Sequence, residues 1–465
     1  MAVVGALVAV AVLTVPAATP SVSVASWGST ALVSPKQVDV GLVKGASSWT
    51  HFGTPFFAVT VQLGGLSTPT LQTLGAYFNS TPITTFRIGG GGEGYDPTTQ
   101  TYYKAPAAGG TFTANHNEVL NYTWIKSWCY SRVPHCDWLA YLPGEENNTQ
   151  AALHAAQYFH NVLHFVPTYW EFDNEPNHWT HYGKNRSQWS TSDASTPSAL
   201  GYAVMVRNYI AAISAVFPSD KFIGVEIGCD CFANYITATA RLNPHVAAMA
   251  YHTYPGPKLT ASTLNEFYGS LSSRQNLSAT TSHFLANIQA QCSQCGNISL
   301  QVGEYQTGPP VNHSAYALRY PGAAWITASV VEALETNLSM FTEFDDSWLI
   351  DSATGAVLPE GVAYQQILKN LTMGSDTALH LNTSKVGSVY AILIKNGTRQ
   401  SLLLVNLNTT VTLNLKLTST IFPIGGAGNE WVWTSLLASP THVHVTLIGS
   451  TFVVAPQEVL LLNNF

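Results

Sequence analysis

The feature that most constrains the fold is an alternation, through the middle of the chain, of short β-rich runs with longer helix-compatible runs. This alternation is typical of a parallel sheet whose strands are connected by crossover helices. The β-rich runs lie at residues 56–63, 83–88, 137–142, 166–173, 221–227, 246–251, 299–303 and 340–344. The helix-compatible runs include residues 147–164, 198–217 and 316–334. These repeats predict an α/β fold, the (β/α)8 TIM barrel, whose site residues follow the C-terminal ends of the strands.

A chain of 465 residues is longer than a single hydrophobic core usually serves, so two domains are expected. We place the barrel at residues 36–370, ending in a helix near 361–371, and an antiparallel β-sandwich at residues 371–465. Strand runs of the second domain lie at residues 389–394, 401–407, 411–417, 442–448 and 459–462. Residues 36–50, ahead of the first barrel strand, are expected to join this sandwich.

The start of the chain predicts export. Residues 2–13 form an apolar run that is too short to span a bilayer and is followed by small residues. We interpret residues 1–26 as a signal peptide, with an uncleaved N-terminal anchor as the alternative, because no Lys or Arg precedes the apolar run. Twelve Asn-X-Ser/Thr sequons add to the prediction of a secreted glycoprotein, extracellular or held at the cell surface.

The charge composition restricts the partners. Charged residues make up 10% of the chain, the net charge is -7, and Lys and Arg together number 19. This leaves no basic stripe for nucleic acid or for heavily sulfated polymers. We expect an oligosaccharide or polysaccharide substrate, no nucleic acid, no membrane contact beyond the possible anchor, and a monomer or weak oligomer.

The six cysteines fit an oxidising compartment. Cys129 and Cys136 are seven positions apart, and Cys292 and Cys295 form a CxxC pair, so local disulfides are expected. Cys229 and Cys231 form a CxC pair, in which a direct bridge is strained, so pairing with other cysteines stays open. Zinc binding is the alternative, but the two-CxxC pattern of a zinc site is missing.

Polar side chains collect at the end of the fourth predicted strand. The run reads Tyr169-Trp170-Glu171-Phe172-Asp173-Asn174-Glu175-Pro176-Asn177. Pro176 stops the strand and defines the turn, so Glu175 and the amide of Asn174 are expected at the barrel mouth. Such an amide can hydrogen-bond a sugar hydroxyl, although Asn is also a good turn-capping residue.

The seventh predicted strand ends in Gly303-Glu304 and brings a second carboxyl group to the same rim. Retaining glycoside cleavage needs two such groups about 5 Å apart, one to protonate the leaving oxygen and one to attack the anomeric carbon. After the sixth strand, Tyr254 is placed to donate a hydrogen bond to Glu304, which would lower the pKa of that carboxyl. We therefore expect Glu175 as the general acid and base and Glu304 as the nucleophile.

Four segments resemble clan A glycoside hydrolases, and most closely family 79, which includes heparanase-like and β-glucuronidase enzymes. They are Phe86-Arg87-Ile88-Gly89-Gly90, Asn174-Glu175-Pro176-Asn177, His252-Thr253-Tyr254 and Gly303-Glu304. The resemblance covers residues 36–465 and implies the same two roles for Glu175 and Glu304. Asp173 departs from the family, which usually has Gly before Asn-Glu-Pro.

Further candidates for substrate binding surround these two glutamates. They are Asn174, Tyr254, His252, Arg87, Trp179, Asp345 and Trp348. Arg87 either braces the nucleophile or pairs with a structural acid, and Glu226 is either a substrate ligand or that acid. His252 is alternatively a packing residue. Trp179 and Trp348 are expected to stack on sugar, and Asp345 to bind hydroxyl groups, with a structural role as the alternative for Asp345 and Trp348.

Two motifs point to other chemistry and are set aside. Residues 89–94 match the dinucleotide pattern GxGxxG, but Tyr95-Asp96-Pro97 follows and opens no helix. His178 and His181 have HxxH spacing without a third ligand for a metal. We therefore expect no metal and no cofactor.

The sequence thus predicts a secreted retaining glycosidase that cleaves β-glycosidic bonds, and the resemblance to family 79 implies a β-glucuronidase-like preference for the sugar. One alternative is an endo-β-glucanase or cellulase-like hydrolase of the same clan. Another is a non-catalytic carbohydrate-binding or surface-layer protein on the same barrel.

Overall fold

A computed structural model describes most of the chain from residue 36 onward. The described residues are 36–42, 50–52, 56–61, 68–81, 83–88, 93–96, 100–104, 118–119, 122–132, 135–144, 147–178, 198–228, 233–254, 268, 277–306, 320–336, 338–344, 346–351, 354–370, 376–383, 388–396, 399–417, 431–435, 441–445, 451–454 and 456–464. The predicted signal peptide or anchor, the Cys229 and Cys231 pair, and the Gly89 to Gly92 run lie outside them. No helix in this part of the chain is both long and apolar enough to cross a membrane.

Eight parallel strands form the predicted barrel. They are β3 (Phe57–Val61), β4 (Thr85–Ile88), β8 (Asp137–Tyr141), β9 (Tyr169–Glu171), β10 (Ile223–Ile227), β11 (Ala248–Thr253), β12 (Ser299–Tyr305) and β13 (Met340–Phe344). Their order is β10-β11-β12-β13-β3-β4-β8-β9, and a parallel bridge between Trp170 and Phe222 joins β9 to β10. The TIM barrel prediction is therefore confirmed.

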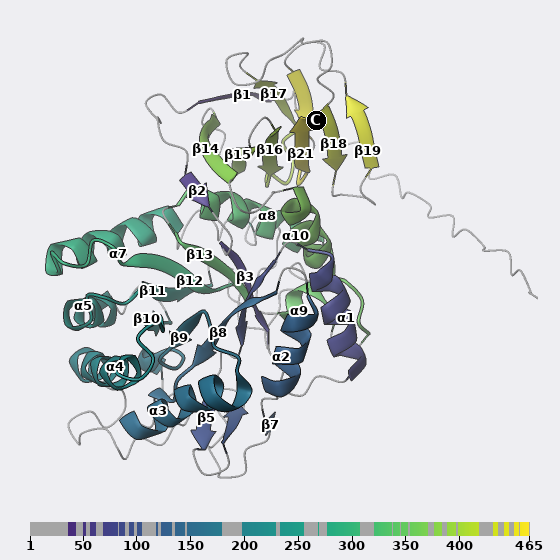
Figure 1. The fold of residues 1–465 in the computed structure, drawn as a ribbon. Helices are drawn as coiled ribbons and strands as arrows, with labels where there is room; N and C mark the ends of the chain where they lie inside the picture. Colours follow the sequence, from purple (N-terminus) through teal and green to yellow (C-terminus); the bar gives the residue numbers. More distant parts are fainter. Residues whose placement is uncertain are drawn as a thin grey trace, which may run out of the picture. The chain divides into compact units, whose positions relative to one another are not determined.

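Helices lie outside this ring of strands, as Figure 1 shows. They are α1 (Thr68–Asn79), α2 (Tyr122–Ser131), α3 (Thr149–Gln157) with a π-helical continuation (Tyr158–Leu163), α4 (Ala199–Ser214), α5 (Ala233–Leu242), α7 (Leu277–Gln291), α8 (Tyr320–Leu334), α9 (Asp346–Leu349) and α10 (Pro359–Asn370). Local sequence sets their starts: Asn148 accepts hydrogen bonds from the backbone of Gln150 and Ala151, and Ser198 accepts one from Gly201. Such side-chain caps satisfy backbone donors that a helix start leaves without partners.

The barrel has two apolar layers. Its outer face and the helices share one large core. A separate buried cluster lies on the strands themselves, formed by Ala58, Leu139, Ile223, Ala248, Ala250 and Met340. Filling of the barrel interior by strand side chains is characteristic of this fold. The interior is thus packed, and the charged residues Arg87, Glu171, Glu226 and Glu304 lie near the C-terminal ends of their strands.

The chain after β4 forms a small antiparallel sheet instead of a helix. Its strands are β5 (Glu93–Asp96), β6 (Thr101–Lys104) and β7 (Glu118–Val119). A dinucleotide-binding GxGxxG run opens a helix. The strand at Glu93 therefore agrees with setting that motif aside.

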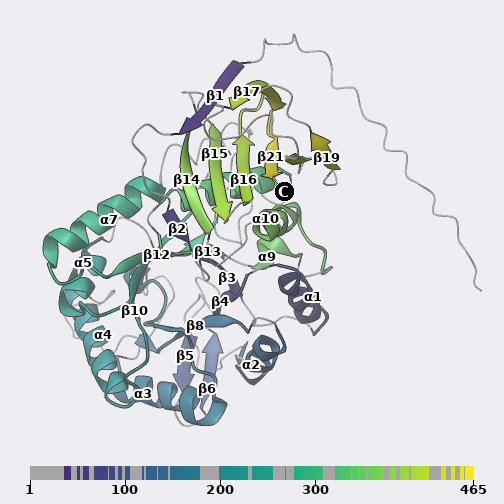
Figure 2. The ribbon, with the colours of Figure 1, turned by 45° about the horizontal axis from the view of Figure 1, so that its top comes forward.

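A second, ten-stranded sheet contains the C-terminal strands. They are β14 (Asp376–Thr383), β15 (Val389–Asn396), β16 (Arg399–Asn406), β17 (Leu413–Leu417), β18 (Trp431–Ser435), β19 (Thr441–Val445), β20 (Thr451–Val454) and β21 (Val459–Asn464). Two strands from the start of the chain join them: β1 (Lys36–Leu42), between β14 and β17, and β2 (Thr50–Phe52), which pairs with β14. Figure 2 shows β1 beside β17, although the two are far apart in sequence. The pairing is antiparallel except between β1 and β17, and a two-layer sandwich stays a prediction.

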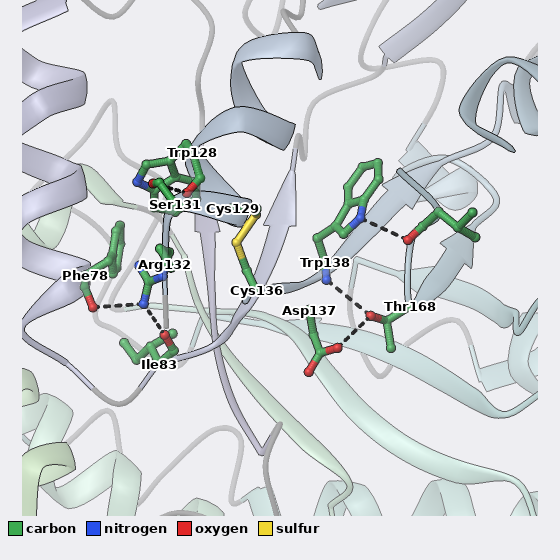
Figure 3. The surroundings of a disulfide bond; sticks show 11 residues. Phe78, Ile83, Trp128, Cys129, Ser131, Arg132, Cys136, Asp137, Trp138 and Thr168 are labelled. Carbon is green, nitrogen blue, oxygen red and sulfur yellow. Dashed lines mark hydrogen bonds between the residues drawn. A yellow bond between two sulfur atoms is a disulfide. The ribbon is translucent and has the colours of Figure 1, made fainter. Parts of the chain in front are cut away.

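Both local disulfides that the spacing predicts are formed, Cys129 to Cys136 and Cys292 to Cys295. Figure 3 shows the first at the end of α2, beside Arg132, which donates to the carbonyl oxygens of Phe78 and Ile83 at 3.0 and 2.7 Å. The disulfide connects α2 to the segment before β8, and the bonds of Arg132 connect the helix end to α1 and to the segment before β4. That segment leads into the strand that carries Arg87.

Candidate active site

The turn after β9 places Asn174 and Glu175. Asp173 and Glu175 have φ angles of 66° and 46°, in the left-handed region that favours glycine. Asp tolerates this region better than most residues, and its Oδ1 accepts a hydrogen bond of 2.7 Å from the backbone N–H of Asn174. The conformation explains why Gly is usual at this position in the family that the motif resembles, and how Asp173 replaces it.

A β-bulge at Gly303 places Glu304. Tyr251 of β11 is opposite Val302 of β12, but the next residue, His252, is opposite Glu304, so Gly303 is the extra residue. A Cβ atom at Gly303 would lie 2.8 Å from Glu226 Oε1 and 3.0 Å from His252 Nε2. Bulges re-aim side chains next to sites, and this one needs glycine because two charged side chains pack against it.

Arg87, on β4, connects four side chains and is fully buried. Its Nε donates to Glu171 at 3.1 Å, and one terminal nitrogen donates to Glu304 Oε1 at 2.7 Å. The other terminal nitrogen donates to Asn174 Oδ1 at 2.9 Å and to Glu226 Oε2. The two alternatives for Arg87, bracing Glu304 and pairing with a structural acid, are thus both present.

His252 lies between the two predicted catalytic glutamates. Its Nδ1 is 2.8 Å from Glu175 Oε1 and 3.4 Å from Glu304 Oε2. One ligand atom from each of the three residues falls within 4.8 Å of the others. Tyr254 donates a hydrogen bond to Glu304 Oε2, as the sequence predicts. Glu175 and Glu304 are therefore neighbours, each mostly buried with 5% and 2% of its surface exposed.

Opposite charges determine the protonation of this cluster. Burial lowers the pKa of His252, but Glu304, Glu175 and Glu226 outweigh burial and raise that pKa to about 10. Burial raises the pKa of Glu226, but Arg87 and His252 outweigh it and lower that pKa to about 2. His252 is therefore an imidazolium and Glu226 a carboxylate at neutral pH.

The pKa of Glu304 moves in the direction opposite to the prediction. Burial raises it, and Glu175 adds to the increase. His252, Arg87 and the hydrogen bond from Tyr254 lower it, but not enough to cancel the effect of burial. The expected contribution of Tyr254 is present, yet removal from water is the larger effect.

Glu175, His252 and Glu304 have the donor types of a metal site, but their surroundings do not fit one. An imidazole binds a metal only in its neutral form, and a carboxylate oxygen that accepts a hydrogen bond has fewer lone pairs left for a metal. Here His252 carries a proton, and both oxygens of Glu304 accept hydrogen bonds, one from Arg87 and one from Tyr254. These three side chains therefore fit a charged hydrogen-bond network and not a metal site.

The remaining predicted residues are less informative. Trp348 lies on α9, after β13, and exposes 1% of its surface, so stacking on a sugar stays a prediction. Trp179, Asp345 and His181 lie outside the described residues. Asn177 is buried and accepts a hydrogen bond of 3.1 Å from the backbone of Gly228, which connects the turn after β9 to the end of β10.

Two residues of the cluster carried no role in the sequence prediction. Glu171 is fully buried and bonds Arg87, and Tyr141 lies with its ring 5.0 Å from the Arg87 guanidinium and its hydroxyl 3.5 Å from Glu226 Oε2. The sequence signal for Glu171 was that it is the last residue of an apolar strand and lies four residues before Glu175. A buried strand that contains a carboxylate needs a partner for it, and Arg87 was the nearest predicted cation.

Comparisons with known proteins define the fold. No family model matches the chain, and no curated protein matches it. A family 51 α-L-arabinofuranosidase from Bifidobacterium longum is similar in structure, with a TM-score of 0.65 and 12% identity over 93% of this chain and 100% of that one. A bifunctional glucanase-xylanase from a metagenome library has a TM-score of 0.64, with 12% identity over 92% of this chain and 99% of that one.

A glycoside hydrolase family 44 endoglucanase from Clostridium thermocellum has a TM-score of 0.62, with 12% identity over 92% of this chain and 100% of that one. At such identity the likeness concerns the fold alone. The chain thus has a fold similar to that of glycoside hydrolases of several families. None of these three structures is named as family 79, and membership of that family stays a proposal.

Proposed function

We propose that the chain is a retaining glycoside hydrolase in which Glu304 is the nucleophile and Glu175 the general acid and base. The observation that carries the proposal is the separation of the two carboxyl groups, whose nearest oxygens lie within 4.8 Å. Retaining enzymes hold these groups about 5 to 5.5 Å apart, whereas inverting enzymes leave about 6.5 to 9.5 Å for a water molecule. The barrel fold shared with several glycoside hydrolases supports the same class of reaction.

The first step forms a glycosyl-enzyme. Glu304 attacks the anomeric carbon, the glycosidic C–O bond breaks, and the leaving oxygen takes the proton of Glu175. Arg87 and Tyr254 each donate to one oxygen of Glu304 and so hold the carboxylate in one orientation. The Nδ1–H of the His252 imidazolium donates to Glu175 Oε1 at 2.8 Å and so orients the carboxyl group of the acid.

The second step releases the sugar. Glu175, now ionised, takes a proton from water as the water oxygen attacks the anomeric carbon and frees Glu304. The positive charge of His252, 2.8 Å from Glu175, stabilises that ionised state. The configuration at the anomeric carbon is inverted twice and is therefore retained.

The substrate class is a separate part of the proposal. The resemblance to family 79 favours a β-glucuronide, but both cations described at the site, Arg87 and His252, already face carboxylates. A sugar without its own charge needs no further cation, so this pairing favours a neutral β-glycoside, as in an endo-β-glucanase. Aryl β-glucosides, β-xylosides and β-glucuronides assayed side by side distinguish the two candidates.

Activity and stereochemistry test the reaction. We expect E175Q and E304Q to lose at least about 1,000-fold in kcat/KM on the best aryl β-glycoside, since each group acts in the transition state. E335Q, a change on the chain just after α8, serves as the matched control and should keep the activity. Proton NMR of the first product should show the β-anomer.

Chemical rescue separates the two roles. With azide, E304A should form an α-glycosyl azide and E175A a β-glycosyl azide, because azide replaces the nucleophile in one case and the attacking water in the other. Turnover that survives both Gln variants, or a wild type that binds glycans without turnover, would instead favour the non-catalytic carbohydrate-binding alternative.

We also propose that the protein is secreted and acts as a monomer or weak oligomer. The two disulfides support an oxidising compartment, because cytosolic thiols are normally kept reduced. N-terminal sequencing of protein recovered from the culture medium tests cleavage near residue 26. An intact N-terminus in the membrane fraction would favour the anchor, and light scattering after size exclusion gives the oligomeric state.

A further inference from the structure

Two buried glutamates beneath the catalytic pair have no assigned role. Glu171 ends β9 and Glu226 lies near the end of β10, with 0% and 1% of their surfaces exposed. Both bind the guanidinium of Arg87, Glu171 through Nε at 3.1 Å and Glu226 through a terminal nitrogen. The same guanidinium holds Glu304 and Asn174, so the two glutamates determine how Arg87 meets the catalytic groups.

The oxygen atom of each carboxyl group that does not contact Arg87 is the first sign that the pair holds a proton. Oε1 of Glu171 and Oε1 of Glu226 are buried and receive no hydrogen bond from the described residues. Two ionised carboxylates in contact away from water repel each other, whereas a carboxylic acid and a carboxylate can share a hydrogen bond. One proton shared by the two carboxyl groups removes this repulsion.

The count of charges leads to the same number of protons. Two cations, Arg87 and His252, face four carboxyl groups, those of Glu171, Glu175, Glu226 and Glu304. A general acid holds one proton on Glu175, which leaves three negative charges against two positive ones. A further proton makes the buried cluster neutral, and buried charge is costly unless it is paired.

The surroundings indicate which glutamate holds that proton. Glu226 faces both cations, Arg87 directly and His252 Nε2 at 3.6 Å, and its Oε2 lies 3.5 Å from the Tyr141 hydroxyl. Glu171 faces one cation, Arg87. Burial and Glu226 also raise the pKa of Glu171, while Arg87 and His252 lower the pKa of Glu226 despite its burial.

We propose that Glu171 and Glu226 are positioning residues that share one proton, carried by Glu171, and together hold Arg87 against Glu304 and Asn174. The neutral Glu171 donates to Glu226 and accepts from Arg87, and the ionised Glu226 balances Arg87 and His252. The kinetic part of this inference rests on the proposed function, because it assigns the nucleophile to Glu304. The charge count rests on it too, through the proton on Glu175, whereas the burial and the contacts of Glu171 and Glu226 do not.

Three variants test the proposal. E171Q keeps a donor for Glu226 and an acceptor for Arg87, as a neutral acid does, whereas E226Q removes the negative charge and E171M removes both hydrogen bonds. We expect E226Q and E171M each to lose at least about tenfold more kcat than E171Q, the effect of losing a hydrogen bond to a charged group. The opposite order, with E226Q more active than E171Q, would overturn the assignment.

Infrared spectroscopy provides a readout that does not depend on activity or on the stability of E226Q. The difference spectrum of wild type minus E171Q should contain the carbonyl stretch of one buried carboxylic acid. A difference spectrum that shows only carboxylate bands would contradict a proton on Glu171. If E175Q and E304Q prove active, the proposed reaction fails, and this spectrum still decides the position of the proton.

Discussion

Two buried carboxyl clusters lie on this barrel, and they differ in what faces the carboxyl groups. In the catalytic cluster, Arg87 and His252 lie among the glutamates. In the second cluster, Gln306 after β12 donates to Glu343 on β13 and, at 2.9 Å, to Glu360 on α10. Burial raises the pKa of two tyrosines beside this pair, Tyr77 and Tyr364, and the charges of Glu343 and Glu360 raise it further.

The difference shows that burial alone does not decide the charge of a glutamate. Burial raises the pKa of Glu360 to about 8, because the hydrogen bonds from Gln306 and Glu343 compensate only in part. Burial acts on Glu226 in the same direction, yet Arg87 and His252 lower its pKa to about 2. The two cations that face Glu226, Arg87 and His252, therefore separate this ionised glutamate from Glu360, whose described partners are uncharged or acidic and which is largely protonated at neutral pH.

Removal of the cation is the strongest way to break this comparison. R87M removes the guanidinium partner of three buried carboxyl groups, those of Glu171, Glu226 and Glu304, and we expect the free energy of unfolding to fall by about 3 to 5 kcal/mol, as for other broken buried ion pairs. Activity should fall by at least about 100-fold in the folded enzyme, because Glu304 loses a donor. Urea denaturation and kcat on an aryl β-glycoside measure the two effects.

R132M is the matched control for this change. Arg132 is also buried, but it donates to the backbone carbonyls of Phe78 and Ile83 and lies over the rings of Phe86 and Trp128. We expect R132M to lower stability while the folded fraction keeps its kcat. An R87M protein as stable and active as R132M would show that the charges of the cluster do not depend on Arg87.

A change in packing tests whether the positions of the charges matter as well as their presence. G303A adds a methyl group 2.8 Å from Glu226 Oε1 and 3.0 Å from His252 Nε2. We expect a loss of about 1 to 3 kcal/mol in stability from overpacking, and a fall in kcat as the two side chains move. G296A is the control, because a Cβ atom there meets nothing within 4 Å. Equal behaviour of the two variants would argue against a crowded bulge.

The pH dependence of stability sharpens the comparison, because the two clusters predict opposite signs. Glu360, with its pKa raised to about 8, contributes stability that is complete below the unfolded value of 4.5 and is lost as the pH rises through 8. Glu226, with its pKa lowered to about 2, contributes stability that is present above 4.5 and is lost as the pH falls toward 2.

E360Q should therefore be more stable relative to wild type at alkaline than at acidic pH, by at least about 1 kcal/mol. E226Q should show its largest deficit at neutral and alkaline pH and a smaller one in acid. Thermal unfolding of the three proteins from about pH 3 to about pH 9 measures both trends. Parallel curves for E360Q and E226Q would contradict the contrast between the clusters.

The smallest effect is expected from the backbone of the catalytic turn. D173G removes the strain of a φ angle of 66° but also the hydrogen bond from Asp173 to the N–H of Asn174. These effects oppose each other, so we expect stability to change by less than about 1 kcal/mol. A loss above about 2 kcal/mol would mean that the Asp173 side chain, and not the backbone conformation, holds the turn.

The barrel was predictable from the sequence because its signal is local. Each strand is a short apolar run, and each intervening helix has its own periodicity and, at Asn148 and Ser198, its own cap. Of the strands that the sequence did not indicate, β5, β6 and β7 form the small sheet after β4, and β14, β18 and β20 belong to the C-terminal sheet. Their pairing depends on distant partners such as β1 and β21, which no local pattern reveals.

For the site, the sequence by itself determined which strand ends carry Glu175, Glu304, Asn174 and Tyr254, because a proline turn and polar residues after an apolar strand are local signals. Only the tertiary structure decided the charges. Glu171 and Glu226 lie far apart in sequence and meet on one guanidinium, and the bulge at Gly303 brings Glu304 beside His252. The pKa of a buried group depends on which charges surround it, and that depends on how distant strands are arranged.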